Sequence, residues 1–171
     1  MFRVLNDVVA CWSQEAESTL KVLEAIPDGA MNQAVNSEHR DLKRMAWHLV
    51  ETLIEMPGRL GVKVEGAELI QSGQMADPPA SMVAIREAYA RASRSFLEAI
   101  APWSDADLEQ EDDMYGETWK RGVTFWVLIT HQVHHRGQMT VLMRQAGLVV
   151  PSIYGPAKEG WAYYGMAAPR V

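Results

Sequence analysis

Histidines are concentrated in one short run of the chain, which reads His-Gln-Val-His-His-Arg-Gly-Gln from 131 to 138. His131 and His135 are four residues apart, so on an α-helix both imidazoles project from the same face. A pair with this spacing supplies two ligands to one divalent metal ion, and a third ligand comes from another element. The candidate third ligand is His48, which lies in a separate helical segment upstream. The sequence therefore predicts a mononuclear metal site.

Two other metal motifs do not match these histidines. The zinc-protease motif His-Glu-x-x-His requires a glutamate as general base, and the corresponding residue is Gln132, which cannot accept a proton. A di-iron bundle requires Glu-x-x-His pairs, and no histidine of this chain has a glutamate three residues before it. Within the run, His134 is an open alternative to His135, because it lies three residues from His131.

Four segments with helical periodicity are expected to position these residues. They cover approximately the following ranges: 4–26, 37–57, 81–100 and 118–146. Ser37 and Ser81 are the expected N-caps, and Gly147 is the expected C′ residue. Residues 61–80 form a long crossover loop, and residues 102–117 form a polar, acidic connection. Long helical segments without an alternating strand pattern predict an all-α fold, specifically a four-helix bundle.

A helical wheel for the last segment groups the histidine pair with apolar residues. The stripe comprises Thr124, Val127, Leu128, His131, His135, Gln138 and Leu142. Both imidazoles are therefore expected to point into the bundle. His48 lies on the flank of the apolar face of its own segment. Gln138 is a candidate to donate a hydrogen bond to a bound anion, and Glu51 or Glu55 is a candidate to orient an imidazole or to serve as a base. Arg136 points away from the stripe and is expected to pair with a carboxylate inside the bundle.

Composition narrows the class of protein. The 171 residues are 48% hydrophobic and carry a net charge of −6, which is ordinary for one soluble globular domain over 1–171. An acidic chain without a basic stripe is not expected to bind nucleic acid. No apolar stretch is long enough to cross a membrane, and the charged N-terminus does not resemble a signal peptide. A single cysteine, Cys11, allows no internal disulfide, so we expect a cytoplasmic protein.

The segment after the last helix, residues 148–171, is a tail rich in aromatic side chains and without helical periodicity. Its members include Tyr154, Trp161 and Tyr163. Because large aromatic side chains gain most from burial, we expect this tail to pack on the bundle and to cover one end of it.

Three motifs of the chain resemble the DinB/YfiT-like family. They are Ala-Trp-His-Leu-Val-Glu at 46–51, the histidine run at 131–138, and Pro-Ser-Ile-Tyr-Gly-Pro at 151–156. The resemblance implies a four-helix bundle that holds one divalent metal ion. It also implies a cytoplasmic protein that forms homodimers. The positions that match the metal ligands of the family are His48, His131 and His135.

The resemblance and the ligand set together lead to a functional expectation. Three neutral imidazoles around Zn²⁺, Ni²⁺ or Fe²⁺ leave a coordination position open, as in catalytic sites. Characterised relatives include transferases that use low-molecular-weight thiols and some proposed hydrolases. We therefore expect a metal-dependent thiol S-transferase or hydrolase acting on a small molecule. The alternative is a bundle that binds a metal or a small ligand without catalysis.

Overall fold

The computed structural model describes residues 1–170 and is predominantly helical, as predicted. Its long helices are α1 (Leu5–Glu24), α2 (Leu42–Arg59), α3 (Met82–Ile100) and α4 (Arg121–Gln145). Short 3-10 helices are η1 (Asp28–Ala30), η2 (Ala67–Leu69), η3 (Asp105–Glu109) and η4 (Lys158–Tyr164). No helix within the described residues combines the length and the apolar character needed to span a bilayer.

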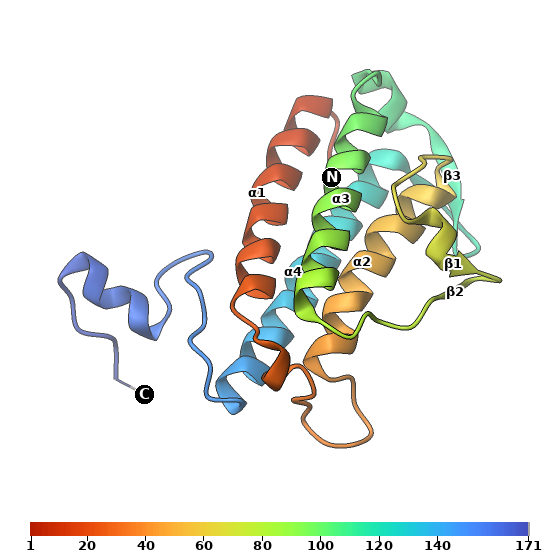
Figure 1. Ribbon diagram of the computed structural model, residues 1–171. Helices are drawn as coiled ribbons and strands as arrows, with labels where there is room; N and C mark the ends of the chain where they lie inside the picture. Colours follow the sequence, from red (N-terminus) through yellow and green to blue (C-terminus); the bar gives the residue numbers. More distant parts are fainter. Residues whose placement is uncertain (171) are drawn as a thin grey trace.

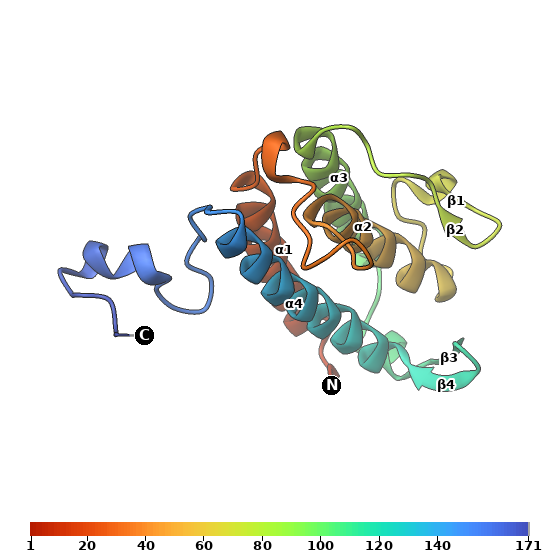
Figure 2. The same cartoon turned by 90° about the horizontal axis from the view of Figure 1, so that it is seen from below.

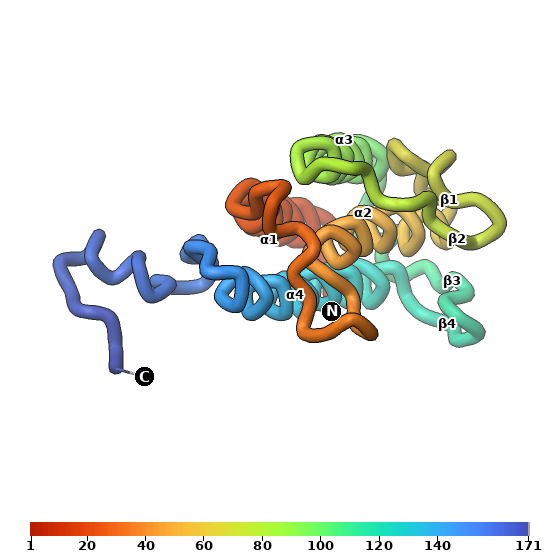
Figure 3. The backbone as a smooth tube through the Cα atoms, turned by 60° about the horizontal axis from the view of Figure 1, so that its bottom comes forward, coloured from red at the N-terminus to blue at the C-terminus, as the bar shows by residue number. Residues whose placement is uncertain are grey.

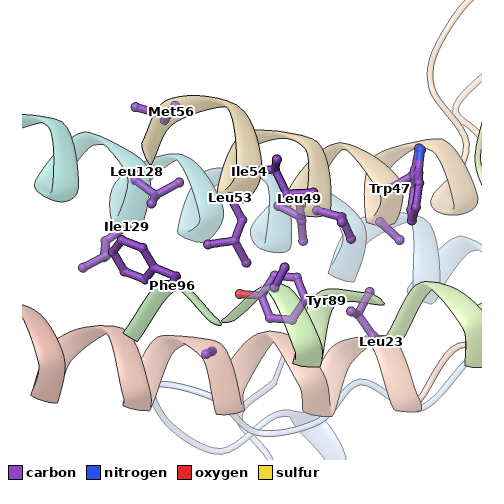
Figure 4. Close-up of a cluster of buried hydrophobic side chains, with 14 of the residues drawn as sticks. Leu23, Trp47, Leu49, Leu53, Ile54, Met56, Tyr89, Phe96, Leu128 and Ile129 are labelled. Carbon is purple, nitrogen blue, oxygen red and sulfur yellow. The ribbon is translucent and has the colours of Figure 1, made fainter. Parts of the chain in front are cut away.

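The four long helices lie side by side around one core (Figure 1). Helix α1 packs against α3 and α4, and α2 packs against the same two helices. Large side chains from all four helices fill the space between them, as part of this layer shows in Figure 4. The fully buried members include Trp12, Leu49, Leu53, Tyr89, Phe96, Phe125 and Leu128. Edge-to-face contacts between these aromatic rings, such as Phe96 with Phe125 at 5.3 Å, hold the core at a defined packing.

Side chains cap the N-termini of two of the four long helices, α2 and α3. Ser81 accepts a hydrogen bond from the backbone N–H of Ala84, and Gly147 follows α4 with a φ of +73°, as predicted. The predicted start of the second helix is wrong. Asp41, rather than Ser37, caps α2 by accepting from the backbone N–H of Arg44 at 2.7 Å. The preceding residues form an irregular loop instead.

Two connections expected to be loops each contain a short antiparallel hairpin. Strands β1 (Ile70–Gln71) and β2 (Gln74–Met75) pair in the first, and β3 (Glu111–Met114) and β4 (Glu117–Lys120) pair in the second. Strands of two to four residues are too short to show a readable alternation, which explains why the sequence did not predict them. The β3–β4 turn places Tyr115 at a φ of +62°, a conformation that is rare for a bulky residue.

The aromatic tail does not cover the end of the bundle as predicted. Val150 is buried in the core, Ile153 packs against it, and the Tyr154 hydroxyl contacts Arg136. Residues 158–170, by contrast, project away from the helices (Figures 1 and 2). Tyr154 and Tyr163 are 64% and 89% exposed. An exposed ion pair between Arg144 and Glu159 is the polar link from η4 back to α4. The predicted packing is therefore wrong beyond the first residues of the tail.

Candidate metal centre

The structure brings His48, His131 and His135 together, although 83 residues separate the first two. Helices α2 and α4 run next to each other (Figure 3). The His48 ring on α2 lies with its centroid 5.3 Å from that of His131 and 4.8 Å from that of His135 on α4. One ligand nitrogen from each ring lies within 4.8 Å of the others. The Nε2 atoms of His48 and His131 are 3.2 Å apart. His134 is exposed and lies outside this group, so the structure places His135 beside His131 instead.

Two of the three rings are oriented by partners on their outer side. The Nδ1 atom of His48 lies 2.8 Å from Glu51 Oε2, and the Nδ1 atom of His135 lies 2.8 Å from Gln138 Oε1. Both partners are acceptors, so each Nδ1 carries the proton and each Nε2 presents a lone pair. This is the arrangement in which a carboxylate or amide holds a metal-binding imidazole in the correct tautomer. Glu51 therefore occupies the orienting position that the sequence suggested. Gln138 contacts His135 in the same way, although the sequence suggested that it would donate to a bound anion.

The protonation of the pair on α4 also favours metal binding. Burial, with smaller contributions from the neighbouring histidines and Arg40, lowers the pKa of His131 to about 4. Burial also lowers the pKa of His135, although its hydrogen bond to Gln138 opposes the shift. Both imidazoles are therefore neutral at pH 7, which is the form that coordinates a metal.

A divalent metal fits the spacing of these nitrogens. Metal–nitrogen bonds of about 2.0–2.1 Å in a tetrahedral site place two ligand nitrogens roughly 3.3 Å apart. The 3.2 Å separation of the two Nε2 atoms of His48 and His131 matches this value. One ligand nitrogen of His135 lies within 4.8 Å of this pair, so a single cation can contact all three rings. An all-nitrogen donor set suits Zn²⁺, Ni²⁺ and Fe²⁺ better than Mg²⁺ or Ca²⁺.

The predicted orientation of the α4 stripe is wrong by one residue. His131 and His135 are only half-buried and lie at the edge of the helix interface, whereas Gln132 and Arg136 are 0% and 2% exposed. Thr124, Leu128 and Leu142 of the predicted stripe are buried, whereas Gln138 is exposed. The shift leaves the histidines open to solvent on one side.

Gln132 connects three helices directly behind the histidines, a role that sequence reasoning missed. Its Nε2 atom donates to the carbonyl oxygen of Leu49 at 2.9 Å and to Thr52 Oγ1 at 3.1 Å. The hydroxyl of Tyr89 on α3 donates to its Oε1 atom at 3.2 Å. These contacts fix α4 against the turn of α2 that carries His48. The position of Gln132 directly after His131 was the signal in the sequence that could have indicated this role.

Arg136 forms the buried ion pair that the sequence predicted. Its guanidinium pairs with Glu15 on α1 and donates to Thr19 Oγ1 at 3.1 Å. It also donates to the hydroxyl of Tyr154 at 2.6 Å, and that hydroxyl donates to Glu15 at 2.6 Å. The network ties α1, α4 and the start of the tail together on the side of α4 away from the three histidines.

A cavity of about 340 Å³ opens beside His48 and His131. Its wall carries Glu51, Glu55 and Tyr115, so it is acidic. The Tyr115 hydroxyl donates to Glu55 Oε2 at 2.6 Å, which helps to hold the strained β3–β4 turn over the cavity. Sequence reasoning missed Tyr115, because only the hairpin brings it to the site.

Comparisons with known proteins agree with this architecture. The DinB family model matches residues 1–170. The uncharacterised protein YrdA of Bacillus subtilis (strain 168) is 38% identical over 174 residues, which span all of both chains. A DinB-like protein from Bacillus cereus ATCC 10987 has a TM-score of 0.82 at 36% identity, over 90% of this chain and 100% of the other.

A second solved structure shares the fold at a greater distance. The DinB-like protein YjoA of Bacillus subtilis has a TM-score of 0.68 at 14% identity, over 88% of this chain and 99% of the other. Its likeness supports the helical arrangement alone. The family model and the similarity to YrdA extend over nearly the whole length of the sequence. The chain belongs to the DinB family.

Proposed function

We propose that this helical bundle binds one divalent metal ion through His48, His131 and His135. The observation that carries the proposal is the convergence of three imidazole nitrogens within 4.8 Å, two of them 3.2 Å apart. Zn²⁺, Ni²⁺ and Fe²⁺ are the candidate ions, because imidazole suits them. Three protein ligands leave a coordination position open, which is typical of catalytic rather than structural sites.

The site supports a metal-dependent thiol S-transferase or hydrolase that acts on a small molecule. A divalent ion held by neutral ligands lowers the pKa of a bound water or thiol and so supplies a nucleophile near neutral pH. Glu51 and Gln138 orient the two outer imidazoles through their Nδ1 atoms. Tyr115 lines the adjacent cavity, and burial together with Glu55 raises the pKa of its phenol, so it remains a hydrogen-bond donor there.

Metal content of purified variants tests the proposal. Wild type, His131→Ala and His134→Ala are purified without a histidine tag, incubated with Zn²⁺ or Ni²⁺, and analysed for metal per chain. His134→Ala is the matched control, since it removes a neighbouring histidine of α4 that lies outside the group. About one ion per chain in wild type and control, lost in His131→Ala, supports the site. Retention of the metal by His131→Ala, with circular dichroism unchanged, overturns it.

Activity assays then separate the two reactions. A transferase consumes a low-molecular-weight thiol together with an electrophile, whereas a hydrolase turns over an activated ester or amide without thiol. Metal binding without turnover in either assay leaves a non-catalytic binding protein.

A further inference from the structure

A second cavity opens on the other side of the histidines, next to His135. It has a volume of about 420 Å³ and lies between the loop before α2 and the last turns of α4. Much of its wall is apolar and comes from Val35, Met45, Val141 and Leu142. Val35 and Val141 are 65% and 56% exposed. Exposed apolar side chains that gather around a concave site mark a surface for an apolar ligand.

The charged member of this cavity wall is Arg40, in the loop just before α2. Among residues 1–170, none of the ion pairs includes this guanidinium, and no carboxylate lines the cavity. Arg40 lines the same cavity as His135 and Gln138, so its guanidinium lies beside the site. An unpaired guanidinium is the usual partner of a carboxylate or phosphate.

The two cavities that flank the histidines therefore differ in charge. The one beside His48 carries Glu51 and Glu55, whereas the one beside His135 carries Arg40. Glu55 is ion-paired with Arg59, whereas the guanidinium of Arg40 has no carboxylate partner among the described residues. An acidic ligand therefore finds an available positive charge in the second cavity and none in the wall of the first. A divalent ion at the three histidines adds positive charge between them, which strengthens the preference for an anion.

We infer that the cavity beside His135 binds a small organic acid whose anionic group pairs with Arg40 and whose apolar body contacts Val35, Met45 and Val141. This inference rests on the proposed function, because it names the substrate class of the same site. In this pose the part of the acid nearest His135 is the part presented to the metal. A guanidinium recognises carboxylates and phosphates alike, so the test uses both.

Binding of three probes tests the inference. Hexanoate, hexyl phosphate and the neutral hexanamide are titrated by calorimetry into Zn²⁺-loaded and metal-free protein. Arg40→Gln is the variant, and Arg94→Gln, an exposed arginine on α3 that also lacks an ion pair, is the matched control. We expect Arg40→Gln to weaken binding of at least one acid about tenfold, the size of one charge-assisted hydrogen bond, and to leave hexanamide unchanged. Arg94→Gln leaves all three unchanged.

Equal affinity of Arg40→Gln and wild type for both acids overturns the inference. An equal loss of affinity for hexanamide in Arg40→Gln also overturns it. Weakening of one acid alone identifies the carboxylate or the phosphate as the natural group. Metal per chain is measured in each sample. If wild type binds no metal, the proposed function fails, whereas the comparison of Arg40→Gln with wild type in metal-free protein still decides the inference.

Discussion

The orientation of each imidazole depends on a single neighbouring side chain. Glu51 lies one turn after His48, and Gln138 lies one turn after His135, so each helix supplies both a ligand and its partner. The i, i+3 spacing makes these contacts local, and they form as soon as the helix forms. A carboxylate raises the basicity of its imidazole more than a neutral amide does. Glu51 is therefore the more influential partner of the two.

Replacement of Glu51 tests this role. We expect Glu51→Ala to weaken metal binding about 10–100-fold, because the His48 ring loses the acceptor that holds its tautomer. Glu51→Gln retains an acceptor oxygen and weakens binding less. Competition with a chromophoric chelator measures both affinities. Wild-type affinity in Glu51→Ala would show that His48 does not depend on this carboxylate.

At the scale of the elements, α4 presents the candidate metal-binding histidines on one face and buried polar side chains on the adjacent face. One face places His131 and His135 at the edge of the interface with α2, and the next buries Gln132 and Arg136. The polar contacts behind the histidines fix the rotation of α4 about its axis. Because a rotation would break those buried hydrogen bonds, it is costly. The buried polar residues therefore keep the ligand pair aimed at α2.

The Arg136–Glu15 pair provides a stability test of this arrangement. Arg136→Met leaves Glu15 buried without its partner, and we expect a loss of about 3–5 kcal/mol in the free energy of unfolding. The double variant Arg136→Met with Glu15→Gln loses less, because no charge remains unpaired. Arg144→Met breaks an exposed ion pair on the same helix and changes the free energy of unfolding by less than about 1 kcal/mol. Urea denaturation gives these values, and equal losses for Arg136→Met and Arg144→Met would contradict the expectation.

The same network predicts a response to alkaline pH. Burial and the hydrogen bond to Glu15 raise the pKa of Tyr154 to about 12. An unfolded tyrosine has a pKa of about 10. The raised value contributes stability that is complete below pH 10 and is lost as the pH rises towards 12. We expect Tyr154→Phe to lose less stability than wild type between about pH 9 and 11.5. Parallel denaturation curves for the two proteins would oppose this prediction.

At the scale of the whole molecule, the four long helices pack around one core, and most of the tail does not contribute to it. The helices share one core, whereas most tail residues after Val150 remain exposed. We expect a chain that ends at Pro156 to keep its metal and to change its melting temperature by no more than about 2–4 °C, since it loses one exposed ion pair. A chain that ends at Gly147 also loses Val150 and Tyr154 and melts at a lower temperature. Thermal denaturation with metal analysis compares them, and a large loss in the longer chain would show that the tail stabilises the helices.

Local patterns in the sequence were sufficient for several parts of this protein. His131 and His135 lie on the same face of one helix because they are four residues apart, so this candidate pair could be predicted without knowledge of the fold. The position of each long helix followed from its periodicity and from signals such as Ser81 and Gly147. The motif around His48 indicated the third histidine through the resemblance to the DinB family.

Tertiary packing decided the rest. A helical wheel cannot tell which of two adjacent stripes is buried when the buried one contains a glutamine and an arginine, because their partners lie on other helices. Tyr115 and Arg40 could not be predicted either, because contacts with distant segments place them. A hairpin brings Tyr115 to one cavity, and an irregular loop brings Arg40 to the other. The sequence by itself determined the candidate histidines and the helices that carry them. Contacts between segments far apart in the chain determined where the site opens and which charges surround it.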